Sequence, residues 1–157
     1  MIKFLVISIL AMSFTFSASI DKLSFYKAFE SNSEATMQSK IENLEKLAQS
    51  DQKDAYLGAL TMKKSQFEKT PKEKAELFKV GKTLLESAIS SSPKKAEYRF
   101  LRLAIQENTP KVLKYNTSIE EDVKMIQDSY NSLDGTVKRV IKKYAESSKN
   151  LNSQLLK

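Results

Sequence analysis

Two arginines in the second half of the chain are the side chains best suited to grip another molecule. Arg99, Arg102 and Gln106 follow one another at intervals of three and four residues, so they share one face of a predicted helix. A guanidinium presents a planar fork of donors that fits a carboxylate, a phosphate or the end of a peptide. We predict that this face, together with the neighbouring Tyr98, binds a partner. Pairing with a neighbouring helix, or plain solvation, is the alternative.

The one cluster of carboxylates in the sequence is Glu120-Glu121-Asp122. These residues fall in the first turn of a predicted helix, where the helix dipole favours negative charge. The cluster lacks the alternating acidic residues and the glycine of a calcium-binding loop. We therefore interpret it as a helix start and not as a metal or acid–base site.

Glu107 is the other carboxylate with an unusual position. In a helix it projects close to the apolar side formed by Phe100 and Leu103. A carboxylate there needs a partner, unless it lies at the helix end in water. Because Thr109-Pro110 stops the helix directly afterwards, we predict that Glu107 lies at the helix end in water.

Histidine and cysteine are both absent from the sequence, which excludes an imidazole base, a thiolate nucleophile and the commonest zinc site. No serine lies in a Gly-x-Ser-x-Gly motif. The three glycines, at positions 58, 81 and 135, are too far apart to form a phosphate-binding loop. The sequence therefore predicts a protein that is not an enzyme and that has no cofactor and no metal.

The elements that carry these residues are all predicted to be helices. Glycine and proline are scarce, helix-favouring residues are plentiful, and no stretch alternates polar and apolar residues for long enough to form a strand. The expected helices cover residues 20–30, 34–49, 54–67, 71–90, 94–107, 119–133 and 135–147, with a short turn at 110–113. After Ser147 we expect the chain to fray.

The sharpest local signal for a helix start is Thr70-Pro71-Lys72-Glu73. Threonine caps the helix, proline fits its first position, and Glu73 reaches back to the free amide of Thr70. Ser118 and Glu121 have the same spacing and predict a second capping box.

The stretch from Tyr56 to Pro93 resembles a tetratricopeptide-type helical hairpin. The residues that carry the resemblance are Leu57-Gly58 in the first helix and Gly81, Leu85, Ala88 and Pro93 in and after the second. A linker from Lys64 to Lys74 makes the unit longer than the family's period of about 34 residues. The resemblance implies an all-α fold of stacked antiparallel helical hairpins, an α-solenoid, in which both glycines lie where helices pack closely. An irregular helical bundle is the alternative.

The first nineteen residues have the three parts of a secretory signal peptide: a basic start at Lys3, an apolar run from Phe4 to Phe16, and small residues before a cleavage site after Ser19. The run is shorter than the roughly 20 residues that span a bilayer. We therefore expect residues 20–157 to form a single helical domain that is exported to the periplasm or secreted, and that does not span a membrane.

Charge and compartment together leave two classes of function open. The net charge is +7, but the charges alternate in sign and do not form the basic blocks of a nucleic-acid-binding arm. We expect an exported, non-enzymatic binding or scaffold protein of the cell envelope whose partner is a protein or a peptide. The alternative is a binder of an anionic envelope component, such as an acidic glycan or a lipid headgroup, through the basic surface.

Overall fold

The computed structural model describes residues 20–156, and this part of the chain is all-α, with seven α-helices and no β-strand. The α-helices are α1 (Lys22–Glu30), α2 (Glu34–Glu45), α3 (Asp51–Lys64), α4 (Pro71–Ser91), α5 (Ala96–Asn108), α6 (Ile119–Ser129) and α7 (Gly135–Ala145). Short 3-10 helices are η1 (Ser65–Phe67), η2 (Lys111–Leu113), η3 (Tyr130–Ser132) and η4 (Ser153–Leu155). The predicted signal peptide and its cleavage after Ser19 lie outside the described residues.

None of the helices in residues 20–156 combines the length and the apolar character needed to cross a membrane.

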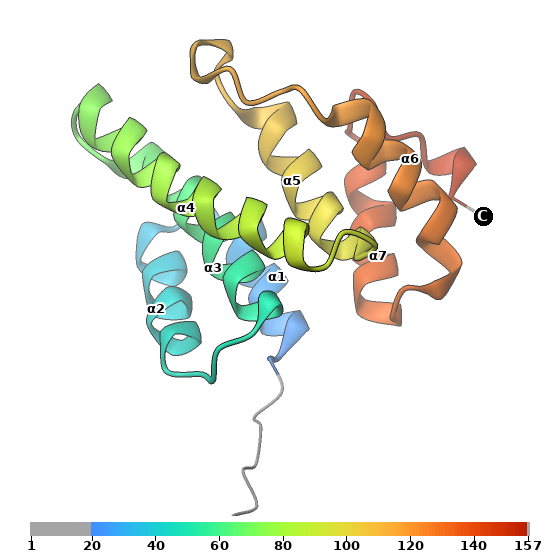
Figure 1. Cartoon of the computed structure of the whole chain (residues 1–157), viewed down its shortest axis with the longest axis horizontal. Coiled ribbons are helices and arrows are strands. Elements are labelled where there is room, and N and C mark those ends of the chain that lie inside the picture. The colour runs from blue at the N-terminus through green and yellow to red at the C-terminus, as the bar shows by residue number, and fades with distance from the viewer. Residues whose placement is uncertain (1–19, 157) are drawn as a thin grey trace, which may run out of the picture.

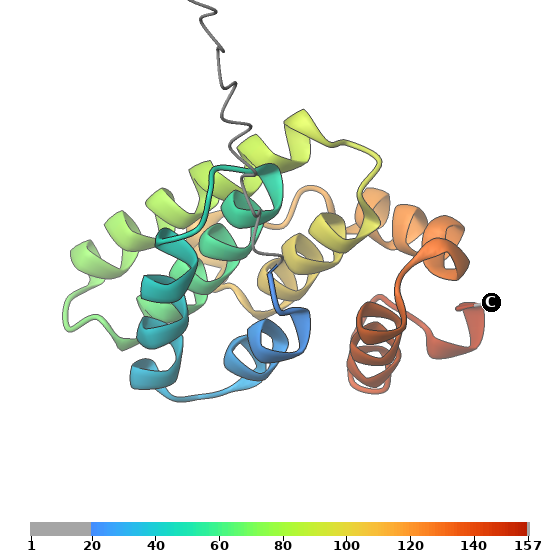
Figure 2. The same ribbon diagram turned by 90° about the horizontal axis from the view of Figure 1, so that it is seen from below.

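The central helix of the fold is α5. In Figure 1, α2, α3 and α4 lie to one side of α5, and α6 and α7 lie to the other. Figure 2 shows α1 on the side of α3 that faces away from α4. Every residue of α5 from Ala96 to Gln106 is buried, so its polar side chains must find partners inside the protein.

The two glycines predicted to be packing residues lie at the contact between α3 and α4. A Cβ atom added to Gly58 would come within 2.6 Å of the Gly81 carbonyl oxygen, and one added to Gly81 would come within 2.6 Å of the Gly58 carbonyl oxygen. The prediction of a close approach at both positions is confirmed. Glycine is required there because the backbones of the two helices leave no room for a side chain.

Helix starts follow the capping signals in most places. The Thr70 box is present: the Thr70 side chain accepts from the Glu73 amide, and the Glu73 carboxylate accepts from the Thr70 amide. The second predicted box is wrong, because Ser118 makes no side-chain cap and Glu121 pairs with Arg99 instead. An ion pair with the neighbouring helix has replaced the local hydrogen bond.

Several predicted helix boundaries also differ from the structure. The second helix ends at Glu45 and not at residue 49, and α3 begins at Asp51 and not at residue 54. The reason is Ser50, whose side chain accepts from the Lys53 amide and caps α3 early. The helix predicted over 119–133 stops at Ser129, and the chain tightens into η3.

An aromatic cluster joins α1, α3 and α5 in the core. The rings of Phe25 and Tyr56 stack with their centroids 3.7 Å apart, and Tyr26 meets Phe25 edge-on at 5.0 Å. Phe100 of α5 lies against Tyr26 on one side and against Tyr144 of α7 on the other. Contacts of this kind add about 0.5–1.5 kcal/mol each beyond the burial of area, so the cluster fixes the three helices together.

The segment after Ser147, predicted to fray, is instead packed against the fold. Leu151 is only 1% exposed, and Leu156 packs against the core. The burial of Leu151, the partial burial of Leu156 and the hydrogen bonds of Asn150 to Glu107 hold this segment in place.

Candidate functional site

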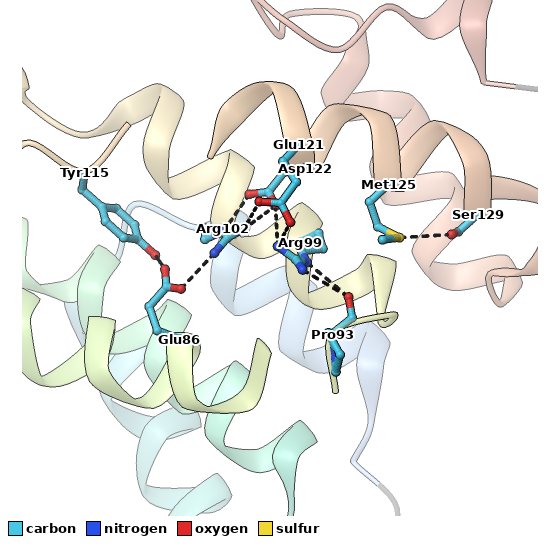
Figure 3. A network of polar contacts seen from close by, with 9 residues as sticks. All are labelled: Glu86, Pro93, Arg99, Arg102, Tyr115, Glu121, Asp122, Met125 and Ser129. Carbon is cyan, nitrogen blue, oxygen red and sulfur yellow. Dashed lines mark hydrogen bonds and ion pairs between the residues drawn. The ribbon is translucent and has the colours of Figure 1, made fainter. Parts of the chain in front are cut away.

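The face of α5 predicted to bind a partner is buried in the structure. Arg99, Arg102 and Gln106 are 8%, 5% and 3% exposed, and Tyr98 is buried as well. Arg102 donates from Nε and Nη2 to the two carboxylate oxygens of Asp122 at 2.8 and 2.7 Å, as Figure 3 shows. The face predicted to bind a partner is therefore covered, and the alternative, pairing with a neighbouring helix, describes both arginines.

The ion network around Arg102 ties α4, α5 and α6 together (Figure 3). Arg102 also donates to Glu86 at 2.9 Å, and Glu86 accepts from the hydroxyl of Tyr115 at 2.5 Å. Arg99 pairs with Glu121 at 2.9 Å and donates to the Pro93 carbonyl oxygen. Burial alone would lower the pKa of Arg102, but the hydrogen bonds and charges of Asp122 and Glu86 raise it above its ordinary value. Both guanidiniums are thus used in holding the fold.

Asp122 is the buried counter-ion of this network. Its side chain is completely buried, and burial raises the pKa of its carboxyl while the hydrogen bonds and charge of Arg102 oppose that rise. The interpretation of the acidic cluster as a helix start is therefore incomplete. Glu120, Glu121 and Asp122 do lie in the first turn of α6, but Asp122 and Glu121 bind arginines of α5.

Gln106 continues the same buried face without completing the network. Its Oε1 atom is buried and has no hydrogen-bond partner among the described residues. Gln106, Arg99 and Arg102 are absent from the lining of both hollows described below.

A second buried carboxylate, Glu97, was missed by the sequence reasoning. Glu97 accepts from the hydroxyls of Tyr26 and Tyr56 and pairs with Lys22 at 2.7 Å. Burial, followed by the charge of Glu97, raises the pKa of both tyrosines. The signal was present in the spacing, because Glu97 precedes Phe100 by three residues and therefore lies on the apolar face of α5.

Glu107 has partners, contrary to the prediction that it lies at the helix end in water. It accepts from the hydroxyls of Tyr144 and Ser148 and from the backbone and side-chain amides of Asn150. The carboxylate therefore joins the end of α5 to α7 and to the segment that follows it.

One feature that is open to a ligand is a hollow of about 690 Å³ where the ends of several helices meet. This volume lies within the roughly 300–1,000 Å³ of small-ligand sites. Its apolar lining comes from α1, α3, α4, α5, η2 and α7, with one main contributor from each: Phe29, Met62, Phe78, Phe100, Leu113 and Val140. We call this feature the apolar hollow.

Three lysines, Lys63, Lys74 and Lys143, also line the apolar hollow. The ammonium of Lys143 pairs with Glu30 at 2.6 Å, and that of Lys74 donates to the Gln66 carbonyl oxygen at 2.7 Å. Lys63 is half-buried, and burial lowers its pKa while the charge of Glu30 acts in the opposite direction. Glu30 is the one carboxylate among the described residues of this lining, so the hollow combines an apolar floor with a charged wall that is positive on balance.

A second hollow, of about 700 Å³, lies at the N-terminal end of α5. Its lining includes Lys22, Glu97 and Asp134, which pair with one another. Because those charges are already paired and most of the residues that line this second hollow are polar or charged, we take the apolar hollow as the candidate site. Within the described chain, no three acidic side chains gather closely enough to hold a metal ion.

No known protein family, no curated protein and no solved structure matches this chain. Its function must be inferred from the geometry of its own residues.

Proposed function

We propose that this chain is an exported, non-enzymatic binding or scaffold protein of the cell envelope, and that the apolar hollow holds a segment of a partner protein. The observation that carries the proposal is the hollow itself. It brings aromatic and aliphatic side chains from six separate elements to one partly enclosed surface. Burial of a partner's apolar side chains there gains about 25 cal/mol for each Å² removed from water.

The use of the charged side chains supports binding over catalysis. Arg99, Arg102 and Asp122 are committed to one internal network, and Glu97 and Glu107 to two others. A general acid or base must instead reach the substrate with its proton-transferring atom. Without histidine or cysteine, the chain also lacks the side chains that most often serve as base or nucleophile.

Export is proposed on the sequence of residues 1–19 alone. The protein isolated from its own cells is expected to begin at Ile20 and to be found in the periplasm or outside the cell. Mass spectrometry of the intact protein tests this. A protein that retains Met1 and stays in the cytoplasm would show that the proposal is wrong.

Two neighbouring residues of η2 provide a matched test of the hollow. Leu113 lines the hollow and is half-buried, whereas Val112 is 83% exposed and lies outside it. Wild type and the Leu113→Asp and Val112→Asp variants would be cross-linked to partners in an envelope extract of the source cell. The partner captured by wild type and by Val112→Asp should be lost with Leu113→Asp, because a charge would enter the apolar floor. Equal capture by both variants would remove the hollow from the proposal.

The lysines around the hollow favour one second candidate, a binder of an anionic envelope component. The excess of positive charge in the whole chain points the same way. Salt separates the two functions, since attraction between exposed charges is screened beyond about 10 Å at 0.1 M salt, while burial of apolar surface is not weakened. A steep loss of binding with salt would favour the anionic component.

A further inference from the structure

We propose that the segment held in the apolar hollow carries a carboxylate directly beside its apolar side chains, and that Lys63 selects it. This inference rests on the proposed function, because it names the chemistry of the partner at the same site. The chemical class is an acidic, apolar peptide segment.

The first observation is the position of the Lys63 ammonium. It donates to the Phe29 carbonyl oxygen and lies 5.1 Å from the centre of the Phe29 ring, at the wall of the hollow. Among the described residues it makes no ion pair with a carboxylate. A partly desolvated ammonium gains most from an incoming anion, since a charge-assisted hydrogen bond is about twice as strong as a neutral one.

The other two lysines of the hollow are less suited to this role. Lys143 is already neutralised by Glu30. Lys74 is exposed, so water screens its charge. Lys63 is therefore the cation of the hollow that combines partial burial with the absence of a direct ion pair within residues 20–156, since the Glu30 carboxylate beside it pairs with Lys143.

The polar lining favours a peptide over an acyl chain. Asn32 and Gln66 both line the hollow, and both are exposed, so their side-chain amides are accessible to a bound segment. An amide group offers one acceptor and two donors, which is what the backbone of a bound peptide needs. An acyl chain has no such groups to satisfy.

The test uses a displayed library of random heptapeptides selected on the purified protein. Wild type is expected to enrich peptides in which an acidic residue neighbours apolar ones. Each enriched peptide is then synthesised with Asp or Glu and with the matching Asn or Gln, and both forms are measured by calorimetry. The acidic form should bind wild type at least about ten-fold more tightly.

The decisive variant is Lys63→Met, and the matched control is Lys79→Met. Lys79 is exposed on α4 and does not line the hollow, so both variants lose one charge but only Lys63→Met changes the site. Lys63→Met should reduce the preference for the acidic form to less than about two-fold, whereas Lys79→Met and Lys63→Arg should keep it. Circular dichroism checks that each variant is folded, and Lys63→Gln replaces Lys63→Met if it is not.

The outcomes separate this inference from the function on which it rests. Equal binding of the acidic and amide forms to wild type would overturn the role of Lys63 and leave the hollow as a docking site. Enrichment of the same peptides on Leu113→Asp as on wild type would overturn the proposed function itself. Dodecanoate bound by wild type but not by Leu113→Asp, with no peptide enriched, would replace the peptide by an amphiphile and overturn both.

Discussion

At the scale of single residues, the polar interior depends on Asp122. Its carboxylate is shared by two guanidiniums in a place that water does not reach, while Glu121 and Glu86 pair with the same guanidiniums nearer the surface. Removing one member of a buried ion pair leaves the other charge without compensation, which costs more than the pair itself contributes. The stability of the fold therefore depends strongly on the single carboxylate of Asp122.

We predict that Asp122→Ala lowers the free energy of unfolding by about 3–5 kcal/mol, because Arg99 and Arg102 lose their fully buried counter-ion and keep only the more exposed carboxylates of Glu121 and Glu86. Urea unfolding followed by circular dichroism measures the change. The control is Asp128→Ala, which removes an exposed pair with Lys124 and should cost about 0.5 kcal/mol. Equal losses in the two variants would show that the network contributes nothing beyond a surface pair.

At the scale of elements, the contact between α3 and α4 has no room for a methyl group. The first carbon of any side chain at Gly81 would also come within 2.6 Å of the Met62 amide nitrogen. The usual advantage of alanine over glycine in a helix, about 1 kcal/mol, is therefore reversed at this position.

Gly81→Ala is expected to lower the free energy of unfolding by about 1–3 kcal/mol through overpacking. Gly135→Ala is the control, since a Cβ there meets nothing closer than an Arg139 side-chain nitrogen at 4.0 Å. Thermal unfolding of the two variants gives the comparison. An unchanged melting temperature for Gly81→Ala would mean that the two helices can separate at no cost.

The Thr70 capping box predicts a dependence of α4 on acid. The hydrogen bonds from the Thr70 side chain and backbone lower the pKa of Glu73 below its ordinary value of 4.5. A carboxyl whose pKa is lowered by folding stabilises the fold at pH values above its ordinary pKa. This contribution is lost as the pH falls through the lowered pKa of the folded protein. Glu73→Gln should therefore destabilise the protein at pH 7 and less so at pH 3, as measured by melting temperature. A loss of equal size at both values would argue against the box.

How far the sequence predicts the elements depends on whether the signal is local. Caps and apolar spacing predicted every α-helix, because these signals lie within a few residues of each other. The cap formed by Thr70, for example, acts within one turn of α4. The Ser118 box was wrong because Glu121 binds Arg99, a residue that no local pattern connects to it. In the same way, arginines at a helical spacing indicate a shared face, but only the packing of α6 shows that the face is covered.

At the scale of the whole molecule, the apolar hollow could not be predicted from the sequence. Its lining runs from Phe29 near the start of the described chain to Ser147 near its end, and the separate faces meet only when all the helices are in place. In the sequence, Phe78 or Val140 cannot be distinguished from ordinary core residues, since each lies on a regular apolar face. A site of this kind follows from tertiary packing and has no motif.

The C-terminal segment gives a test of how the whole fold is held together. Leu151→Ala should lower the free energy of unfolding by about 2–5 kcal/mol, because its side chain fills a buried position. Leu155 is more than half exposed, and Leu155→Ala should change stability by no more than about 0.5 kcal/mol. Urea unfolding of both variants distinguishes a packed segment from a loose one. Equal stability of the two variants would restore the expectation that the chain frays after Ser147.

The buried tyrosines also give this protein an optical property. Four of its six tyrosines donate their hydroxyls to internal carboxylates, and burial raises the pKa of each: Tyr26, Tyr56, Tyr115 and Tyr144. A tyrosine whose pKa is raised by folding stabilises the fold at pH values below its ordinary pKa of about 10. That contribution is lost as the pH rises above this value. These rings therefore ionise when the fold opens. With no tryptophan in the chain, the absorbance of tyrosinate reports alkaline unfolding directly, as a cooperative step without any added label.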